Sequence, residues 1–101
     1  MENAQLNSRL KEGLPAAYEE LFKQTFPRML GYCRLFIKDQ DVANDIVQEC
    51  FVKLWEKKDT IKISQSIESF LFVMLRNRCL NYLRDKKMLI VEKDIQSIQE
   101  N

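Results

Sequence analysis

The stretch that decides the fold runs from residue 41 to residue 55 and reads DVANDIVQECFVKLW. Apolar residues recur in it at spacings of three and four, which is the stripe of an amphipathic helix. They are Val42, Ile46, Val47, Cys50, Phe51 and Leu54. Asp45, Gln48 and Glu49 share the same i, i+3, i+4 relation and form a polar cluster on another side of the helix.

The polar cluster of Asp45, Gln48 and Glu49 has two interpretations. A short acidic and amide patch on a rigid helix suits docking onto a basic partner surface. A patch of this kind is more often only a solvated helix face. The residues alone leave both interpretations open.

Two further helices are expected before this stretch. Residues 2–12 predict a short helix, with Gly13 as its C-terminal stop. Pro15 suits the first turn of the next helix, where its missing N–H costs little. That second helix extends to about residue 38, and we expect Pro27 to interrupt or restart it.

The chain after residue 38 is expected to form two more helices separated by a loop. Asp39 precedes a helix over 41–57 and can cap its free N–H groups. The segment from 57 to 65 is polar, β-branched and poorly helical, which indicates a loop. Ser66, or Ser64, then caps a long helix that extends from 66 to about 87.

Apolar side chains predict which surfaces of these helices face a core. The second helix carries a strongly apolar segment that we expect to be buried on much of its circumference, made of Met29, Leu30, Cys33, Leu35, Phe36 and Ile37. The inner face of the last helix is expected to consist of Phe70, Leu71, Met74, Leu75, Leu80 and Leu83. The sequence therefore predicts an all-α fold, a compact helical bundle with a three-helix core plus an N-terminal helix.

Size and cysteine usage limit the class of protein. A chain of 101 residues with 46% hydrophobic residues forms one domain with a modest core. No apolar run is long enough to span a bilayer, and the N-terminus lacks the features of a secretion signal. Cys33, Cys50 and Cys79 each lie in an apolar helical pattern without CxxC spacing, so we expect buried free thiols in a reducing cytoplasm.

Catalysis is not expected. The chain has no histidine, which excludes an ordinary acid–base relay and a Cys–His pair. Gly13 and Gly31 stand alone, so no glycine-rich phosphate loop is present. The carboxylates of the 41–57 helix lack the partner pattern of bundle metal sites. We therefore expect no enzyme, no cofactor and no metal site.

The net charge of +1 hides an uneven distribution of charge. Residues 1–52 carry six basic and eight acidic side chains, and residues 88–101 carry one basic and three acidic. Residues 53–87 carry nine basic and four acidic side chains. A basic segment of this kind is typical of a nucleic-acid partner.

Most of this basic charge falls on the last helix and the loop before it. The basic residues that we single out are Lys62, Arg76, Arg78, Arg84, Lys86 and Lys87, and Asn77, Asn81 and Tyr82 are interleaved with them. Arginine and lysine neutralise phosphates, and asparagine can hydrogen-bond the edge of an extruded base. The loop at about 57–66 would form the rim of a pocket for such a base. Basic residues near a helix C-terminus are also favoured by the helix dipole alone, so composition leaves both interpretations open.

Two motifs resemble a known family. The pattern Asp-Ile-Val-Gln-Glu-x-Phe-Val-x-Leu-Trp at 45–55 resembles the core-binding helix, region 2.2, of bacterial RNA polymerase sigma factors of the sigma-70 family, closest to the extracytoplasmic-function group. About 15 residues later, FLFVMLRNRCLNYLR at 70–84 resembles that family's promoter-reading helix, W-L-x-x-I-A-x-N-x-x-x-x-Y-x-R. With the helices before them, the motifs cover roughly residues 14–87 and imply a sigma factor region 2 fold.

The resemblance implies roles for both helices. The 41–57 helix would dock on the clamp helices of the polymerase beta-prime subunit, with Asp45, Gln48 and Glu49 making the polar contacts. The last helix and the loop before it would hold the non-template strand of the promoter −10 element, with one base flipped into a pocket. Asn77 falls on the family's pocket asparagine. The residues expected to bind DNA beside it are Lys62, Arg76, Arg78, Asn81, Arg84, Lys86 and Lys87.

The chain departs from the family pattern at several apolar positions. Phe70 stands where tryptophan is usual and Leu75 where alanine is common, and both changes should repack without changing the role. Trp55 matches a family aromatic, but we expect it in the core. Either Phe70 or Phe72 is a candidate stacking platform for the melted strand.

The resemblance also implies a domain layout. We expect an N-terminal helix at 1–13, a region 2 domain at 14–87, and at 88–101 either an extension of the last helix or the start of a linker. The family's C-terminal region 4 domain, which reads the −35 element and meets an anti-sigma factor, has no counterpart after residue 87. The alternative function is a helical protein–protein interaction module without a nucleic-acid role.

Overall fold

The computed structural model describes residues 3–60 and 66–100, and within them the side chains of residue 5, of 8–60 and of 66–87. This part of the chain contains helices and no strand, so the predicted all-α fold is confirmed. The elements in chain order are α1 (Asn3–Lys11), α2 (Pro15–Phe36), α3 (Gln40–Glu56), a single 3-10 turn η1 (Lys58–Thr60) and α4 (Ile67–Glu100).

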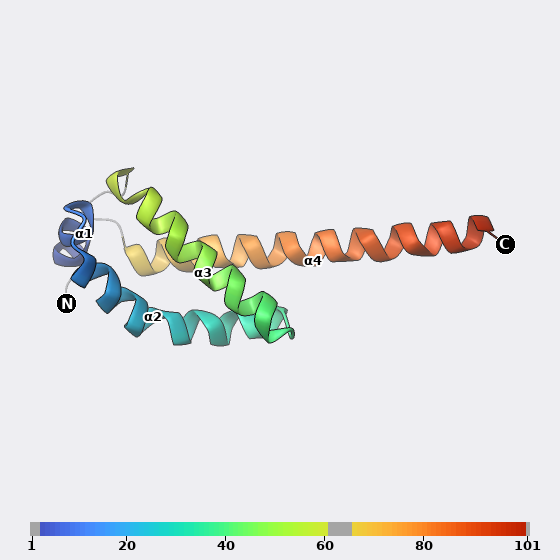
Figure 1. The fold of residues 1–101 in the computed structure, drawn as a ribbon, viewed down its shortest axis with the longest axis horizontal. Helices are drawn as coiled ribbons and strands as arrows, with labels where there is room; N and C mark the ends of the chain where they lie inside the picture. Colours follow the sequence, from blue (N-terminus) through green and yellow to red (C-terminus); the bar gives the residue numbers. More distant parts are fainter. Residues whose placement is uncertain (1–2, 61–65, 101) are drawn as a thin grey trace.

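Helices α2, α3 and α4 pack against one another in every pair and form the core, while α1 packs against α2 and η1. The predicted three-helix core with an added N-terminal helix is therefore confirmed. Figure 1 shows the other helices gathered around the first half of α4, whose second half projects beyond them. The molecule is consequently long in one direction, with extents of 62 × 23 × 18 Å.

The aromatic ring of Phe51 joins α3 to α2. Phe51 is 1% exposed, and its ring meets three aromatic rings of α2. The centroid distances are 6.3 Å to Tyr18, 5.0 Å to Phe22 and 6.2 Å to Phe26. Burying a ring of this size stabilises the fold by about 1.5–3 kcal/mol, and the aromatic contacts add to that.

The buried stripe of α3 is the one that the spacing predicts. Five of its six apolar residues are buried and Val42 is half-buried; the buried five are Ile46, Val47, Cys50, Phe51 and Leu54. Helix α4 presents a stripe at intervals of four, made of Ile67, Leu71, Leu75 and Cys79, all at most 1% exposed.

Two leucines that were expected in the core are exposed. Leu35 is 80% exposed because it stands two residues, or about 200° of helix rotation, from Cys33, which faces the core. Leu80 is 41% exposed because it follows Cys79 by one residue, or about 100° of rotation. The predicted burial of these two side chains is therefore wrong, and helical rotation explains both errors.

Side-chain caps fix where α3 and α4 begin. Asp39 Oδ1 accepts hydrogen bonds from the backbone N–H groups of Asp41 at 3.0 Å and Val42 at 3.2 Å. Ser66 Oγ accepts one from the N–H of Ser69 at 3.2 Å. Both predicted caps are confirmed, Ser66 being the cap of the two serines considered, and each satisfies N–H groups that have no partner inside the helix.

Gly13 ends α1 in the conformation that only glycine adopts without strain. Its φ is +76°, its N–H donates to the Leu10 carbonyl at 2.9 Å, and the N–H of Leu14 donates to the Arg9 carbonyl at 3.2 Å. This pair of bonds is the Schellman arrangement. Pro15 then occupies the first turn of α2, as predicted.

Pro27 does not interrupt α2, contrary to the prediction. The helix continues from Pro15 through Phe36 with Pro27 inside it, and Figure 1 shows α2 changing direction along its length. Pro27 is exposed, while Thr25 and Met29 on either side of it are buried. Packing of these flanking residues offsets the lost backbone bond, so the proline bends the helix without ending it.

Helix α4 continues to Glu100 rather than ending near residue 87, so the first of the two alternatives considered for the tail holds. Residues 88–100 contain neither glycine nor proline, the two residues that most often end a helix. Among the described helices, none has the length and apolarity needed to cross a membrane.

The core position of Leu71 predicts a large loss of stability on truncation. Leu71→Ala should lower the free energy of unfolding by about 2–5 kcal/mol, because it leaves a cavity between packed helices. Leu35→Ala, a matched change on an exposed helix position, should alter it by less than about 0.5 kcal/mol. Urea unfolding followed by circular dichroism measures both. Equal losses would contradict the buried stripe of α4.

Candidate functional site

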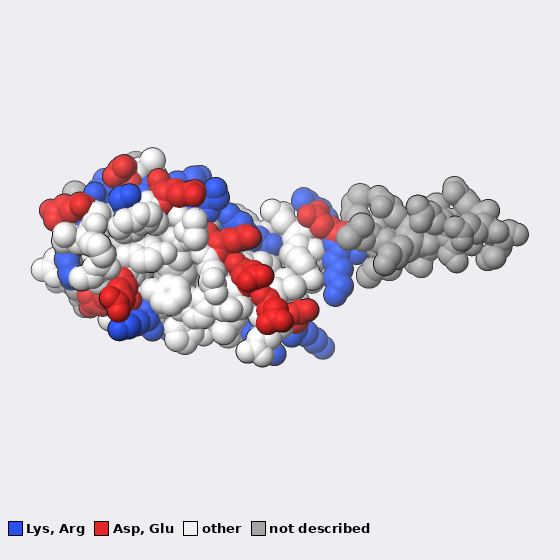
Figure 2. Space-filling view, in the orientation of Figure 1, with Lys and Arg blue, Asp and Glu red and all other residues white. Residues whose placement is uncertain are grey.

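Helix α3 carries an acidic face opposite its buried stripe. Asp45, Gln48 and Glu49 are all exposed, and Asp41 and Glu56 lie within about 40° of Asp45 around the helix. Figure 2 shows the acidic side chains in a row along α3. These five residues are called the acidic face below.

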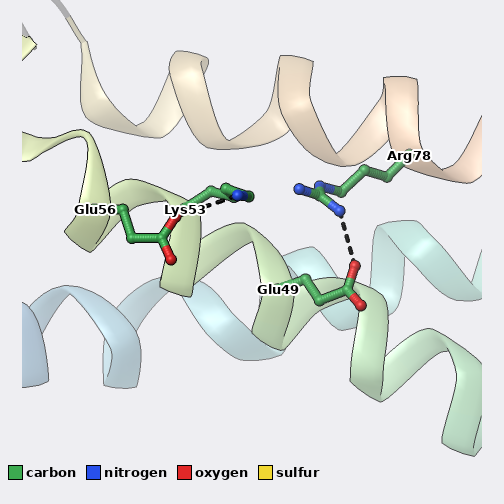
Figure 3. Close-up of polar contacts among 4 residues, drawn as sticks. All are labelled: Glu49, Lys53, Glu56 and Arg78. Atoms are coloured by element: carbon green, nitrogen blue, oxygen red, sulfur yellow. Dashed lines mark hydrogen bonds and ion pairs between the residues drawn. The ribbon is translucent and has the colours of Figure 1, made fainter.

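Members of the acidic face differ in their bonding. Glu49 Oε2 accepts a hydrogen bond from Arg78 Nη1 of α4 at 2.8 Å, and Glu56 pairs with Lys53 Nζ at 3.2 Å (Figure 3). Asp45 and Gln48 form no hydrogen bond or ion pair with another described side chain. The face therefore presents one carboxylate fixed by a neighbouring helix beside two unengaged polar groups.

A hollow of about 400 Å³ adjoins the acidic face at the end of α3. Its lining residues are Pro15, Tyr18, Val52, Trp55 and Glu56. Trp55 is half-buried at this edge and not in the core, contrary to the prediction. Its ring meets Tyr18 edge-on at 5.1 Å, and Lys58 Nζ lies 4.4 Å from the ring centroid, a cation–π contact.

A second hollow, of about 450 Å³, lies at the start of α4. Its lining residues are Lys57, Ser66, Ser69, Phe70, Val73, Met74 and Asn77. Lys57 and Ser66 stand at the two ends of the loop that was expected to form a pocket rim, and both line the hollow. Lys62, which was expected to bind DNA from this loop, lies outside the described residues. This hollow is called the Asn77 hollow below.

The Asn77 hollow offers both a polar group for hydrogen bonding and an aromatic ring for stacking. The exposed Asn77 amide makes no hydrogen bond within the described part of the chain, so its donor and acceptor are both available. Phe70 presents an aromatic side chain beside it. Phe72 instead packs on Tyr32, with ring centroids 5.6 Å apart, and under Arg28. Of the two candidate platforms, Phe70 is the one in the hollow.

The polar residues of α4 do not share one surface. Arg84 lies seven residues after Asn77 and Asn81 four, which places both within about 40° of Asn77 around the helix. Both are exposed, and Arg84 Nε contacts only its neighbour Asp85, at 3.5 Å, among the described side chains. Asn77, Asn81 and Arg84 therefore form one strip that continues from the hollow.

The remaining basic residues of α4 point elsewhere. Arg78 turns toward α3 and pairs with Glu49. Lys86 lies about 180° from Asn77 around the helix. It lines a separate hollow of about 250 Å³ with Lys38 and neighbouring side chains. Arg76 and Lys87 are exposed, both on the side of α4 away from Arg78.

The three cysteines are buried free thiols, as predicted. Cys33 Sγ and Cys79 Sγ lie 3.4 Å apart in the core between α2 and α4. Desolvation by burial raises the pKa of Cys50 to about 11, and the pKa of Cys79 is raised to about 12 by the same desolvation and by its contact with Cys33. Within the described residues, no group of three cysteine, aspartate or glutamate side chains is placed to hold a metal ion.

Local sequence patterns miss two features of the site. Ser69 lines the Asn77 hollow together with Ser66. Its position one helical turn after Ser66 could have predicted that it shares this surface. The bond between Glu49 and Arg78 joins residues 29 positions apart on different helices, so no periodicity reveals it.

Comparisons with known proteins identify a family and a fold. A family model described as sigma-70 region 2 matches residues 21–88. A probable RNA polymerase sigma factor of Haemophilus influenzae is 27% identical over 79 residues, which are 78% of this chain and 41% of that protein. The chain thus spans less than half the length of that protein. An NMR structure of an engineered region 2 of sigmaE in complex with GTAAAA matches with a TM-score of 0.74 at 22% identity, covering 86% of this chain and 90% of that one.

The raised thiol pKa values predict a loss of stability at high pH. Unfolding returns the pKa of each thiol to its ordinary value near 9.0. Between pH 9 and about 11 the native state therefore binds more protons than the unfolded state. The free energy of unfolding should therefore fall with rising pH, by up to about 1.4 kcal/mol per pH unit for each thiol. Urea unfolding at pH 8 and pH 10 measures this slope. Cys50→Ala should reduce it, and an unchanged slope would contradict a buried, protonated Cys50.

Proposed function

This chain belongs to the sigma-70 region 2 family, and on that basis we propose that it is the part of a bacterial sigma factor that binds core RNA polymerase and recognises and melts the promoter −10 element. The observation that carries the proposal is the separation of two surfaces. The acidic face lies on α3, and the Asn77 hollow lies on α4 and the segment before it. One rigid core thus supports two binding surfaces at once.

We assign the acidic face to the polymerase, with the clamp helices of its beta-prime subunit as the partner. Asp45 and Gln48 are exposed without partners among the described residues, so a basic helix can reach them directly. The opposite side of α3 is buried, which fixes these groups relative to one another before binding. Preorganised polar groups lose less side-chain entropy on association.

We assign the Asn77 hollow to one flipped base of the non-template strand. Unstacking a base costs about 3 kcal/mol, which contacts in the pocket must offset. Stacking on Phe70 would supply part of this, since base–aromatic stacking contributes about 1–3 kcal/mol per base. The Asn77 amide would select the base by its edge, while Lys57 and Arg84 would contact phosphates beside it.

The remainder of the proposal follows the family resemblance. We place the chain in the extracytoplasmic-function group and in the cytoplasm, without catalytic activity of its own. Residues 14–87 are the proposed region 2 domain, with 1–13 as an added helix and 88–101 as an extension. An anti-sigma factor is a further proposed partner.

Removal of two polar groups of the acidic face should weaken binding to the polymerase. The Gln48→Ala, Glu49→Ala double variant should bind isolated beta-prime clamp helices at least ~10-fold more weakly, since it removes two polar contacts at one interface. Calorimetry measures the affinity, and circular dichroism checks that helicity is kept. The Glu19→Ala, Gln24→Ala variant on exposed positions of α2 is the matched control and should bind normally. A well-folded wild type that binds no clamp helices would favour the alternative of an interaction module.

Asn77 and Arg84 should affect single-stranded DNA binding in different ways. Asn77→Ala should remove the preference among a panel of hexamers, GTAAAA included, which corresponds to about 1–3 kcal/mol of discrimination, and leave the salt dependence intact. Arg84→Ala should lower the affinity for all hexamers by the same factor. It should also reduce the steepness of log affinity against log salt concentration by about 0.7. Fluorescence anisotropy measures both, with Lys23→Ala on α2 as the control. If every variant and the wild type bind only at background, the nucleic-acid role is wrong.

A further inference from the structure

Arg78 belongs to the basic segment of the chain, but its side chain does not join the strip that Asn77, Asn81 and Arg84 form on α4. It follows Asn77 by one residue, which turns it about 100° around the helix, toward α3. Figure 3 shows its guanidinium extending from α4 to Glu49 on α3. The Nη1–Oε2 distance is 2.8 Å, and the Arg78 side chain is only 28% exposed.

We propose that Arg78 is a positioning residue of the polymerase-binding face, which holds the Glu49 carboxylate in place and does not contact DNA. This inference rests on the proposed function of the acidic face. It adds a residue from a different helix to that face. Arg78 was expected to bind DNA, and this proposal assigns it to polymerase binding instead.

The geometry of the pair leaves Glu49 able to bind a partner. Arg78 bonds to Oε2, and a carboxylate offers further lone pairs on its other oxygen for an incoming donor. The Glu49 side chain is 61% exposed, so that side remains accessible. A glutamate that is already held in one rotamer has less freedom to lose when the polymerase binds.

Other arginines of the bundle show what distinguishes this pair. Arg84 contacts Asp85 on its own helix at 3.5 Å with both side chains about two-thirds exposed, so a phosphate can replace that contact easily. Arg28 pairs with Glu68 and ties α2 to α4, away from the acidic face. Arg28 therefore provides a matched inter-helix ion pair without a proposed role in binding.

A double-mutant cycle on Glu49 and Arg78 tests the proposal. Clamp-helix affinity is measured for Arg78→Gln, Glu49→Gln and the double variant by calorimetry, with Arg28→Gln as the control. Arg78→Gln should weaken binding about two- to fivefold, the range of an exposed ion pair. The double variant should bind no more weakly than Glu49→Gln alone, because Arg78 acts only through Glu49. Arg78→Lys should restore most of the affinity, and Arg28→Gln should change nothing.

A second readout separates positioning from DNA contact. Arg78→Gln should leave the salt slope for single-stranded hexamers unchanged. A flatter slope together with unaltered clamp binding would overturn the proposal and assign Arg78 to phosphates. Tighter clamp binding by Arg78→Gln would overturn it too, because the arginine would then compete with the polymerase for Glu49. In either case Glu49→Gln still weakens clamp binding, whereas failure of the proposed function appears as a folded wild type that binds no clamp helices.

Discussion

The packing of the Phe51 ring against the aromatic side chains of α2 is the contact on which the rest of the molecule depends. It fixes the rotation of α3 about its own axis, because the ring is buried and cannot move without opening the core. Once that rotation is set, Asp45 and Glu49 must face outward. The same constraint brings α3 alongside α4, where Arg78 meets Glu49. An apolar contact thus determines where the charged groups lie.

Helical periodicity and capping chemistry are enough to predict most of the fold. The spacing of apolar residues in α3 identifies its buried stripe, and Asp39 and Ser66 mark where α3 and α4 begin. The errors arise where tertiary packing outweighs a local rule. Leu35 is apolar but largely exposed, and Pro27 removes a backbone hydrogen bond whose loss is offset by core packing on either side of it. Composition does not reveal which side of a strongly apolar helix lacks a neighbour.

The candidate site is predictable to the level of a helix face. Asn77 lies in a hollow with the ends of the expected loop, and Asp45 and Gln48 lie exposed together on α3. Arg78 was nevertheless grouped with Asn77 because the two are adjacent in sequence. Adjacent residues of an α-helix point about 100° apart, so the two side chains face different surfaces. The partner that Arg78 takes lies 29 positions away. Contacts of that kind come from the packing of two helices and are absent from any local pattern.

The position of Trp55 has a consequence for spectroscopy. It is the single tryptophan of the chain, and its indole is half-buried between Tyr18 and the ammonium group of Lys58. Its emission therefore reports on the polarity at one end of α3, beside the acidic face. The Asn77 hollow contains no tryptophan. Intrinsic fluorescence consequently distinguishes events at the two surfaces without an attached dye, since a partner that covers the end of α3 displaces water from the indole and shifts its emission to shorter wavelength.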